Sequence, residues 1–232
     1  NTEGDVIYIS QALARRNPYK ASMKGSIPVN VLTRVPSANA APLDLDINLD
    51  HADMNALALF FNPVTSAEGP IKGYVKVSGA WDDPELRGDV SVKNGRIELL
   101  TLHDPIFPLN MDVKFDGKSA TVEGNAVFGT GKSSVKGGLE WDRGAIIAYN
   151  GEAHLHAPDI HSDYYKGSLD ADFGLGEVMD VPGIEGNIHV HDALVEFPLT
   201  LLSDSGSSSI PALIKLEVLV GDNVRAKSSS LY

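Results

Sequence analysis

Several features common in enzymes and nucleic-acid-binding proteins are missing from this chain of 232 residues. It has no cysteine, which excludes disulfides, thiolate metal sites and a cysteine nucleophile. Lys and Arg number 19 against 31 Asp and Glu, for a net charge of −12. Binding to nucleic acid needs a positive surface, which this balance does not supply. The same balance disfavours flat adhesion to anionic lipid headgroups.

Long apolar runs and helical periodicity are scarce as well. No run approaches the roughly 18 apolar residues that cross a bilayer as a helix. The chain starts at Asn1 without a methionine, and we expect it to be a segment of a longer protein that carries any membrane anchor elsewhere. Ala52–Phe61 predicts one short helix, and Val6–Arg16 predicts a strand that runs into a second. Two short helices cannot cover the apolar faces of about fifteen strands.

Alternation of apolar and polar residues is abundant. Leu43–Asp50 alternates aliphatic with acidic or amide side chains, which is typical of a strand with one buried face. The same pattern predicts strands at Tyr74–Ser78, Asp89–Lys93, Asn110–Asp116, Ser168–Gly174, Asn187–His191 and Ile214–Val220. Turns between strands are predicted at Asn94-Gly95, Asp116-Gly117, Gly137-Gly138, Asn150-Gly151 and Gly221-Asp222. The predicted fold class is all-β, as a sandwich, a closed barrel or a sheet folded over itself.

One internal repeat is visible. Pro84–Leu99 matches Pro182–Phe197 in its proline, its glycine, two inward aliphatic residues, an Asn or Asp, and a final Glu followed by a large apolar residue. A repeated hairpin unit in a chain with few helices indicates units that stack along an axis, each resting on its neighbours. The repeat therefore favours an elongated sheet over a sandwich.

The first repeat and its surroundings resemble a known family. Val77-Ser78-Gly79, Asp83–Gly88 and Val92–Ile97, with the following strand Met111–Phe115, are similar to the repeating unit of the TamB family of AsmA-like bridge proteins. The similarity covers roughly residues 65–226. We therefore expect residues 1–64 to form β-strands with a short helix at the start of a groove. Residues 65–232 would continue it as TamB-like repeats in one elongated domain.

This resemblance implies an elongated β-taco, in which stacked strands form a U-shaped folded sheet with an open hydrophobic groove. It implies a periplasmic segment of a bridge-like lipid transfer protein that moves phospholipid between the inner and outer membranes. The full-length protein would be anchored in the inner membrane and reach membranes at both ends. It would work with an outer-membrane barrel of the TamA/BamA kind in outer-membrane biogenesis and protein assembly. Neither enzymatic activity nor a cofactor is implied.

The inward apolar side chains of such strands would meet the acyl chains of the lipid. The candidate groove residues are Leu43, Leu45, Ile47, Leu49, Val75, Val77, Val90, Val92, Ile97, Leu99, Met111, Val113, Phe115, Leu169, Phe173, Ile188, Val190, Val195, Phe197, Leu216 and Val218.

Histidines and carboxylates allow other chemistry. His154-Leu155-His156 and His189-Val190-His191 each place two imidazoles on one strand face, which a zinc site could use if the two pairs lay on adjacent strands. Asp170 and Asp172 could form a catalytic carboxylate pair or part of a calcium site. Both sets alternate with apolar residues, so we interpret them as solvated polar-face residues. We predict no metal ligand and no catalytic residue.

Two other classes of protein stay open. A structural or adhesive β-solenoid would use the same strands around a dry core and would bind no lipid. A β-rich carbohydrate-active enzyme would need a cleft with converging carboxylates and aromatic platforms, and an aromatic content of 7% argues mildly against it. Trp81 and Trp141 lie near predicted element ends, where they could anchor a turn or core or lie at a groove rim.

Overall fold

A computed structural model describes residues 6–16, 19–28, 41–55, 63–178, 181–198 and 213–229. These residues form one sheet of 14 strands, and no α-helix occurs among them. The all-β prediction is confirmed. The strands are β1 (Val6–Arg16), β2 (Tyr19–Pro28), β3 (Leu43–Asp53), β4 (Val64–Glu68), β5 (Pro70–Ala80), β6 (Asp83–Leu99), β7 (Ile106–Gly117), β8 (Ser119–Phe128), β9 (Gly131–Asp142), β10 (Ala145–His161), β11 (Tyr165–Val178), β12 (Val181–Pro198), β13 (Leu213–Val220) and β14 (Arg225–Ser229).

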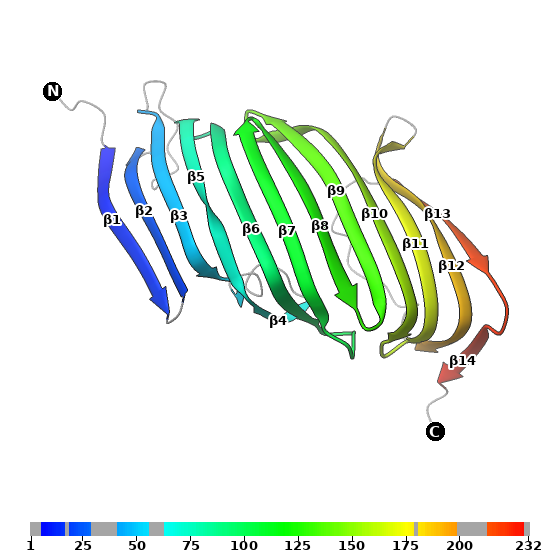
Figure 1. Cartoon of the computed structure of the whole chain (residues 1–232). Coiled ribbons are helices and arrows are strands. Elements are labelled where there is room, and N and C mark those ends of the chain that lie inside the picture. Colours follow the sequence, from blue (N-terminus) through cyan, green and yellow to red (C-terminus); the bar gives the residue numbers. More distant parts are fainter. Residues whose placement is uncertain are drawn as a thin grey trace.

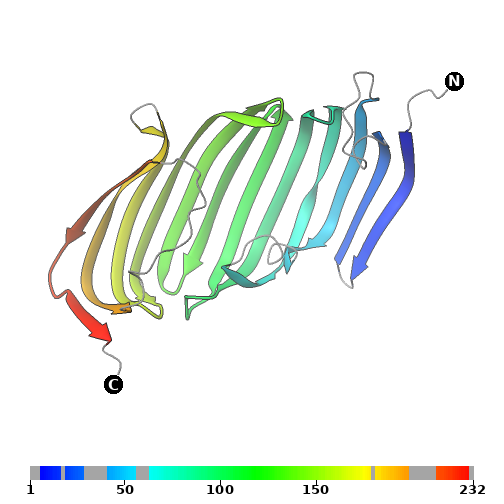
Figure 2. The same cartoon turned by 180° about the vertical axis from the view of Figure 1, so that it is seen from behind.

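Strand order in the sheet follows the sequence from β1 to β13, with β4 and β14 off this path. Neighbours from β1 to β12 pair antiparallel, as tight connections between consecutive strands allow. β13 and β14 both run parallel to β12, along different parts of it. β4 pairs with the last residues of β6. Figures 1 and 2 show the strands side by side in a single twisted layer, with β1 and β13 at opposite edges.

Irregular pairing recurs near one end of the sheet, the end at which β3, β6, β8, β10 and β12 finish. The register shifts between Leu49 and Ala52 in β3, between Val92 and Gly95 in β6, and between Ala157 and Ile160 in β10. β12 has a further shift against β11, next to Asp192. A β-bulge bends its strand and increases the local twist. We call this end of the sheet the bulged end.

Two predictions about turns and repeats are wrong. Asn94-Gly95, Gly137-Gly138 and Asn150-Gly151 lie inside β6, β9 and β10, whereas Asp116-Gly117 and Gly221-Asp222 do mark the ends of strands. The repeat is not a hairpin, because its two copies fill β6 and β12, single strands of 17 and 18 residues. Asn94 and Asp192 have φ values of 55° and 48°. The positive φ that favours these residues in turns also suits a bulge within a strand.

The predicted helices also need correction. Val6–Arg16 is strand throughout, as β1. Ala52 and Asp53 belong to β3, where they pair with Ile71 and Pro70 of β5. The start of the helix predicted at Ala52–Phe61 is therefore wrong, because sheet pairing already satisfies this backbone, and residues 56–62 lie outside the described part of the chain.

Buried apolar side chains gather at the bulged end in two clusters. One consists of Met54, Ala67, Val92, Leu109 and Ala126, with Met54 and Ala67 fully buried. The Met54 backbone N–H donates to the Gly69 carbonyl at 3.2 Å, which fixes the chain after β3. The second cluster consists of Phe128, Ala157 and Ile160, with Leu102, Ile106, Leu155, Tyr165 and Leu169 packed around it. Both clusters are formed by the sheet's own apolar face, and Leu43, Leu45, Val75 and Ala120 are further buried residues away from this end.

Candidate functional site

Strand register places the predicted apolar residues on a single face of the sheet. Residues directly opposite each other in a ladder share a face, and side chains alternate along each strand. Following the pairs from strand to strand therefore traces rows of side chains across the whole sheet. One row crosses β3 to β13 through Leu49, Gly73, Val90, Val113, Val122, Gly137, Gly151, Leu175, Ile184 and Ile214.

We call this side of the sheet the apolar face. Every candidate groove residue whose side chain the structure describes belongs to it, while the side chain of Phe197 lies outside the described residues. By strand, the members are Leu43, Leu45, Ile47 and Leu49 of β3; Val75 and Val77 of β5; Val90, Val92, Ile97 and Leu99 of β6; Met111, Val113 and Phe115 of β7; Leu169 and Phe173 of β11; Ile188, Val190 and Val195 of β12; and Leu216 and Val218 of β13. Their contact with lipid stays a prediction.

The bulges keep this face apolar beyond the bend. In β6, Val90 and Val92 lie on the apolar face before Asn94, and Ile97 and Leu99 lie on it after Asn94. The residues on this face are therefore even-numbered before the bulge and odd-numbered after it. β12 repeats this change, with Val190 before Asp192 and Val195 after it. Ile97 and Leu99 lie an odd number of residues after Val92, so regular alternation without a bulge would turn them to the polar face. The spacing that the two copies of the repeat share therefore encodes a bend in a strand.

Sequence reasoning missed the middle of the apolar face. Its further members are Met54 beyond β3, Ala120, Val122, Ala126 and Phe128 of β8, Val135 and Leu139 of β9, and Ala153, Leu155 and Ala157 of β10. Alternation exists in β8 and β10, but alanine and glycine occupy many of the inward positions and weaken the hydrophobic signal. Met54 carried no signal at all, because a single methionine after a strand has no periodicity.

Two glycines of the repeat face phenylalanines across the apolar face. Gly88 is opposite Phe115, and Gly186 is opposite Phe173. A Cβ at Gly186 would lie 2.9 Å from Phe173 Cδ1 and 2.2 Å from the Asp172 carbonyl oxygen. No side chain fits there without movement of the backbone, so the glycine makes the room that the aromatic ring uses.

Exposure rises from the bulged end toward the opposite end in the second half of the sheet. Ala157 and Ile160 are buried, whereas Leu175 is 45% and Ile146 is 64% exposed. Val218 on the edge strand β13 is 56% exposed. In this half of the sheet the apolar face is therefore closed by its own side chains at the bulged end and more accessible toward the other end, whereas Leu43 and Leu45 in the first half are buried away from the bulges. Exposed apolar surface of this extent is typical of a site that binds another molecule.

The opposite face, here the polar face, is held by cross-strand ion pairs. Lys76 contacts Asp44 and Asp46, and Lys93 Nζ donates to Asp112 Oδ2 at 2.7 Å. The Tyr74 hydroxyl donates to Asp46, and this hydrogen bond, with Lys76 and Lys24 nearby, lowers the pKa of that carboxyl. Pairs of this exposed kind contribute little to stability singly. They fix which side of each strand meets water.

A hollow of about 1300 Å³ spans β6–β10. Its lining combines charged residues of the polar face, such as Asp89, Lys114 and Glu123, with apolar-face residues, such as Val113, Phe115 and Val122. The lining of this hollow is therefore mixed and is not that of a purely hydrophobic groove.

The histidine pairs lie on the polar face but not on adjacent strands. β11 separates β10 from β12, and its carboxylates take up the imidazoles: His154 Nδ1 lies 2.5 Å from Asp172 Oδ1, and His156 contacts Asp170. The hydrogen bond to Asp172 raises the pKa of His154. Within the described ranges, no group of three or more His, Asp or Glu side chains is placed to hold a metal ion.

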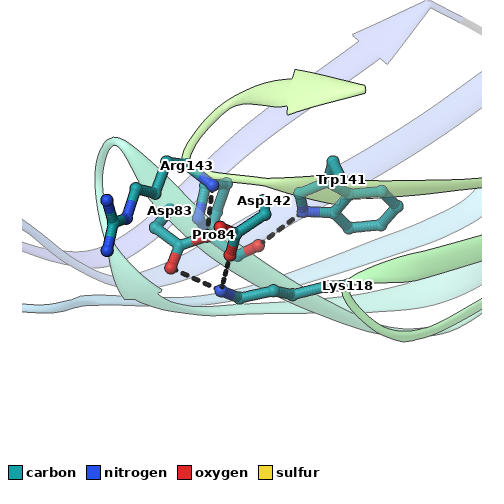
Figure 3. Close-up of polar contacts among 6 residues, drawn as sticks. All are labelled: Asp83, Pro84, Lys118, Trp141, Asp142 and Arg143. Carbon is teal, nitrogen blue, oxygen red and sulfur yellow. Dashed lines mark hydrogen bonds and ion pairs between the residues drawn. The ribbon is translucent and has the colours of Figure 1, made fainter. Parts of the chain in front are cut away.

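A group of contacts ties three turns together at the end opposite the bulges (Figure 3). Lys118, after β7, donates from Nζ to Asp83 Oδ2 at 2.5 Å and to Asp142 Oδ1 at 2.8 Å. Trp141 Nε1 donates to the Pro84 carbonyl at 2.9 Å, and the Arg143 backbone N–H donates to Asp83 at 2.9 Å. We call this group the turn clamp.

The turn clamp perturbs its own ionisable groups and fixes one tryptophan. The Lys118 hydrogen bond, followed by the Arg143 N–H, lowers the pKa of Asp83, while Asp142 and Asp83 raise the pKa of Lys118. Trp141 is thereby anchored to the start of β6, whereas Trp81, in the preceding turn, is 52% exposed. Of the two tryptophans, only Trp81 presents much of its ring to solvent.

No helix in the described part of the chain is long and apolar enough to cross a bilayer. Comparison with protein-family models, with curated proteins and with solved structures finds no match for this chain. The resemblance to the TamB family therefore stays a prediction from the motifs quoted above. What the fold defines is a broader class, a single-sheet β protein with one apolar and one polar face.

Proposed function

We propose that this chain is a segment of a bridge-like lipid transfer protein that holds phospholipid acyl chains against the apolar face of its sheet. The observation that carries the proposal is the continuity of that face. Two of its rows, one from Leu49 and one from Ala52 of β3, contain only apolar and glycine positions as far as β13, while Ser133 of β9 interrupts another. An acyl chain of about 16 carbons gains on the order of 10 kcal/mol on leaving water, at about 0.8 kcal/mol per methylene. A continuous apolar path removes most of that barrier.

The dimensions of the sheet support a path longer than one lipid. The order from β1 to β13 contains twelve strands. With neighbouring strands about 4.8 Å apart, the path across the strands is roughly 50 Å long. A lipid could therefore move from strand to strand without leaving the apolar face. Its headgroup would remain in water beyond the exposed end.

The bulges support a groove in preference to a flat face. Register shifts near the same end of β3, β6, β10 and β12 bend the strands, and Met54, Phe128 and Ile160 are buried there. Bending along this line would give the sheet a U-shaped cross-section with the apolar face inside, which supports the β-taco prediction. Binding would be loose in specificity, since such a surface recognises hydrocarbon.

The location and partners in this proposal come from the TamB resemblance alone. They are the periplasm, an inner-membrane anchor in the full-length protein, contact with both membranes, and an outer-membrane barrel of the TamA/BamA kind. The acidic balance of the chain, −12 overall, suits a protein that meets lipid through hydrocarbon. It does not suit one that adheres to anionic headgroups.

A photocrosslinking experiment tests the proposal with neighbouring residues as probe and control. Val113 of β7 faces the apolar side, and the adjacent Lys114 faces the polar side. A photoreactive amino acid at position 113 should capture phospholipid in cells, and the same amino acid at position 114 should not. Mass spectrometry of organic extracts from gently purified protein should identify the lipid.

Equal capture at both positions would contradict the proposal, because a polar-face probe cannot reach a chain held on the other side. Absence of lipid from both the crosslinks and the extracts would favour the structural β-solenoid with a dry core. A polar substitution at Ile188 gives a further readout. It should reduce co-purifying lipid by more than the neighbouring substitution His189→Asn, which changes the polar face of the same strand.

A further inference from the structure

Among the strands that the structure describes, β13 lies at one edge of the sheet, and this edge lacks the usual protection. It pairs with β12 on one side, and the described residues provide no strand on its other side. All its residues from Ile214 to Val220 are exposed. Such an edge carries a row of unpaired N–H and C=O groups, which pair readily with another extended strand. Edges that stay single are normally blunted by proline, by bulges or by charge.

The opposite edge of the sheet shows that protection. β1 has a register shift between Ile9 and Ala12 and ends in Arg15 and Arg16. β13 reads Leu-Ile-Lys-Leu-Glu-Val-Leu-Val, and its register against β12 is regular throughout. It has no proline and no bulge, and its two charges are of opposite sign. Those charges, Lys215 and Glu217, lie symmetrically about Leu216.

We propose that β13 is a self-association edge at which β13 of a second copy pairs antiparallel, with the two-fold axis at Leu216. In this register Lys215 of each copy lies opposite Glu217 of the other, and Ile214 lies opposite Val218. Lys215 and Glu217 belong to the polar face, and Ile214, Leu216 and Val218 belong to the apolar face. The pairing therefore joins apolar face to apolar face across the two copies. It goes beyond the proposed function, which needs only one chain.

Other registers fit less well. An axis at Lys215 would place two lysines opposite each other, and an axis at Glu217 would place two glutamates opposite each other. Like charges directly opposite destabilise an antiparallel pair. A register slipped by one residue would join the apolar face of one copy to the polar face of the other. An axis at Leu216 alone satisfies both charges and keeps both faces continuous.

Charge reversal gives a test that distinguishes this register from general stickiness. Lys215→Glu and Glu217→Lys each convert two attractive pairs into two repulsive ones, so each should weaken dimerisation about tenfold or more. An equimolar mixture of the two variants restores both ion pairs, as does the double variant Lys215→Glu/Glu217→Lys. Sedimentation equilibrium of the whole chain should therefore show a dimer for the wild type, the mixture and the double variant.

Arg87→Glu is the matched control, because it makes the same charge change at an exposed residue of β6, a strand with neighbours on both sides. It should leave the dimer unchanged. Circular dichroism would confirm that each variant keeps its strands, and the double variant tests the register even if one single variant folds poorly. A monomeric wild type would overturn the proposal, whatever other partner this edge then has. Single variants that dimerise normally, or a mixture that does not recover, would overturn it equally.

Discussion

The substitution Asn94→Val should destabilise the bulged end of the sheet while leaving every residue of the apolar face unchanged. Asn94 is the extra residue of the β6 bulge, with φ at 55°, and a β-branched side chain at positive φ costs about 1–2 kcal/mol. A strand that escaped this cost by giving up the bulge would alternate regularly from Val92. That alternation turns Ile97 and Leu99 toward the polar face and Arg96 and Glu98 toward the apolar face.

The magnitude follows from comparing the two states open to the variant. Ile97 and Leu99 are half-buried, and full burial of an aliphatic side chain contributes about 1.5–3 kcal/mol. Loss of half-burial at both positions would cost about 2 kcal/mol, before any cost of placing Arg96 and Glu98 among apolar side chains. Keeping the bulge at about 1–2 kcal/mol is therefore the cheaper state. With a urea dependence of about 2–3 kcal/mol per M, the midpoint should fall by roughly 0.5 M.

Urea unfolding followed by circular dichroism measures this change, with Asn94→Gly as the control. Asn94→Gly keeps the bulge and tolerates positive φ, so its midpoint should stay near that of the wild type. If Asn94→Val unfolds at the wild-type midpoint, positive φ at the bulge does not set the face of the residues after it, and our account of the repeat fails.

Two further predictions concern pH. Lys118→Met removes the cation that Asp83 and Asp142 share. The folded pKa of Asp83 lies below its ordinary 3.8. The wild type should therefore lose the stabilisation that Lys118 gives to the ionised Asp83 as pH falls below that value. The variant should have a slightly lower Tm at neutral pH and a shallower decline in acid. The folded pKa of His154 lies above 6.5, so its stabilisation is present below that pH and is lost as pH rises through the folded pKa. His154→Gln should therefore reduce the difference between urea midpoints measured at about pH 6 and about pH 8.

Which residues share the apolar face could be predicted from the sequence, and the reason is geometric. Alternation within a strand shows which of its residues share a face. Paired strands place their apolar residues on the same side of the sheet, because that side excludes water. Correct alternation at Leu45, Val113 and Ile188 was therefore enough to bring residues from β3, β7 and β12 to one side. The apolar-face residues of β8, β9 and β10 were not predicted, because alanine, glycine and serine at their inward positions differ too little in hydrophobicity from the outward residues.

The bends could not be predicted, because the local chemistry of a turn and of a bulge is the same. Asn94-Gly95 supplies positive φ in either case, and only the partner strand decides whether the chain reverses or continues. Here Leu109 and Ile106 of β7 lie opposite Gly95 and Ile97, so the ladder continues past the bulge. Gly137 and Gly151 were misread for another reason, since each pairs with the other inside the sheet.

The bulges also connect the fold to the proposed function. A regular single sheet with an apolar face would expose that face along its whole length, and flat exposed edges favour aggregation. Bends near Ala52, Asn94, Ile160 and Asp192 allow the face to bury part of itself, with Ile160 only 6% exposed, while Leu175 stays 45% exposed. A dry-core solenoid would need the open part covered by a further layer of chain. A lipid chain would cover it without one, and could leave again, which is why the partial closure argues for a transient apolar occupant.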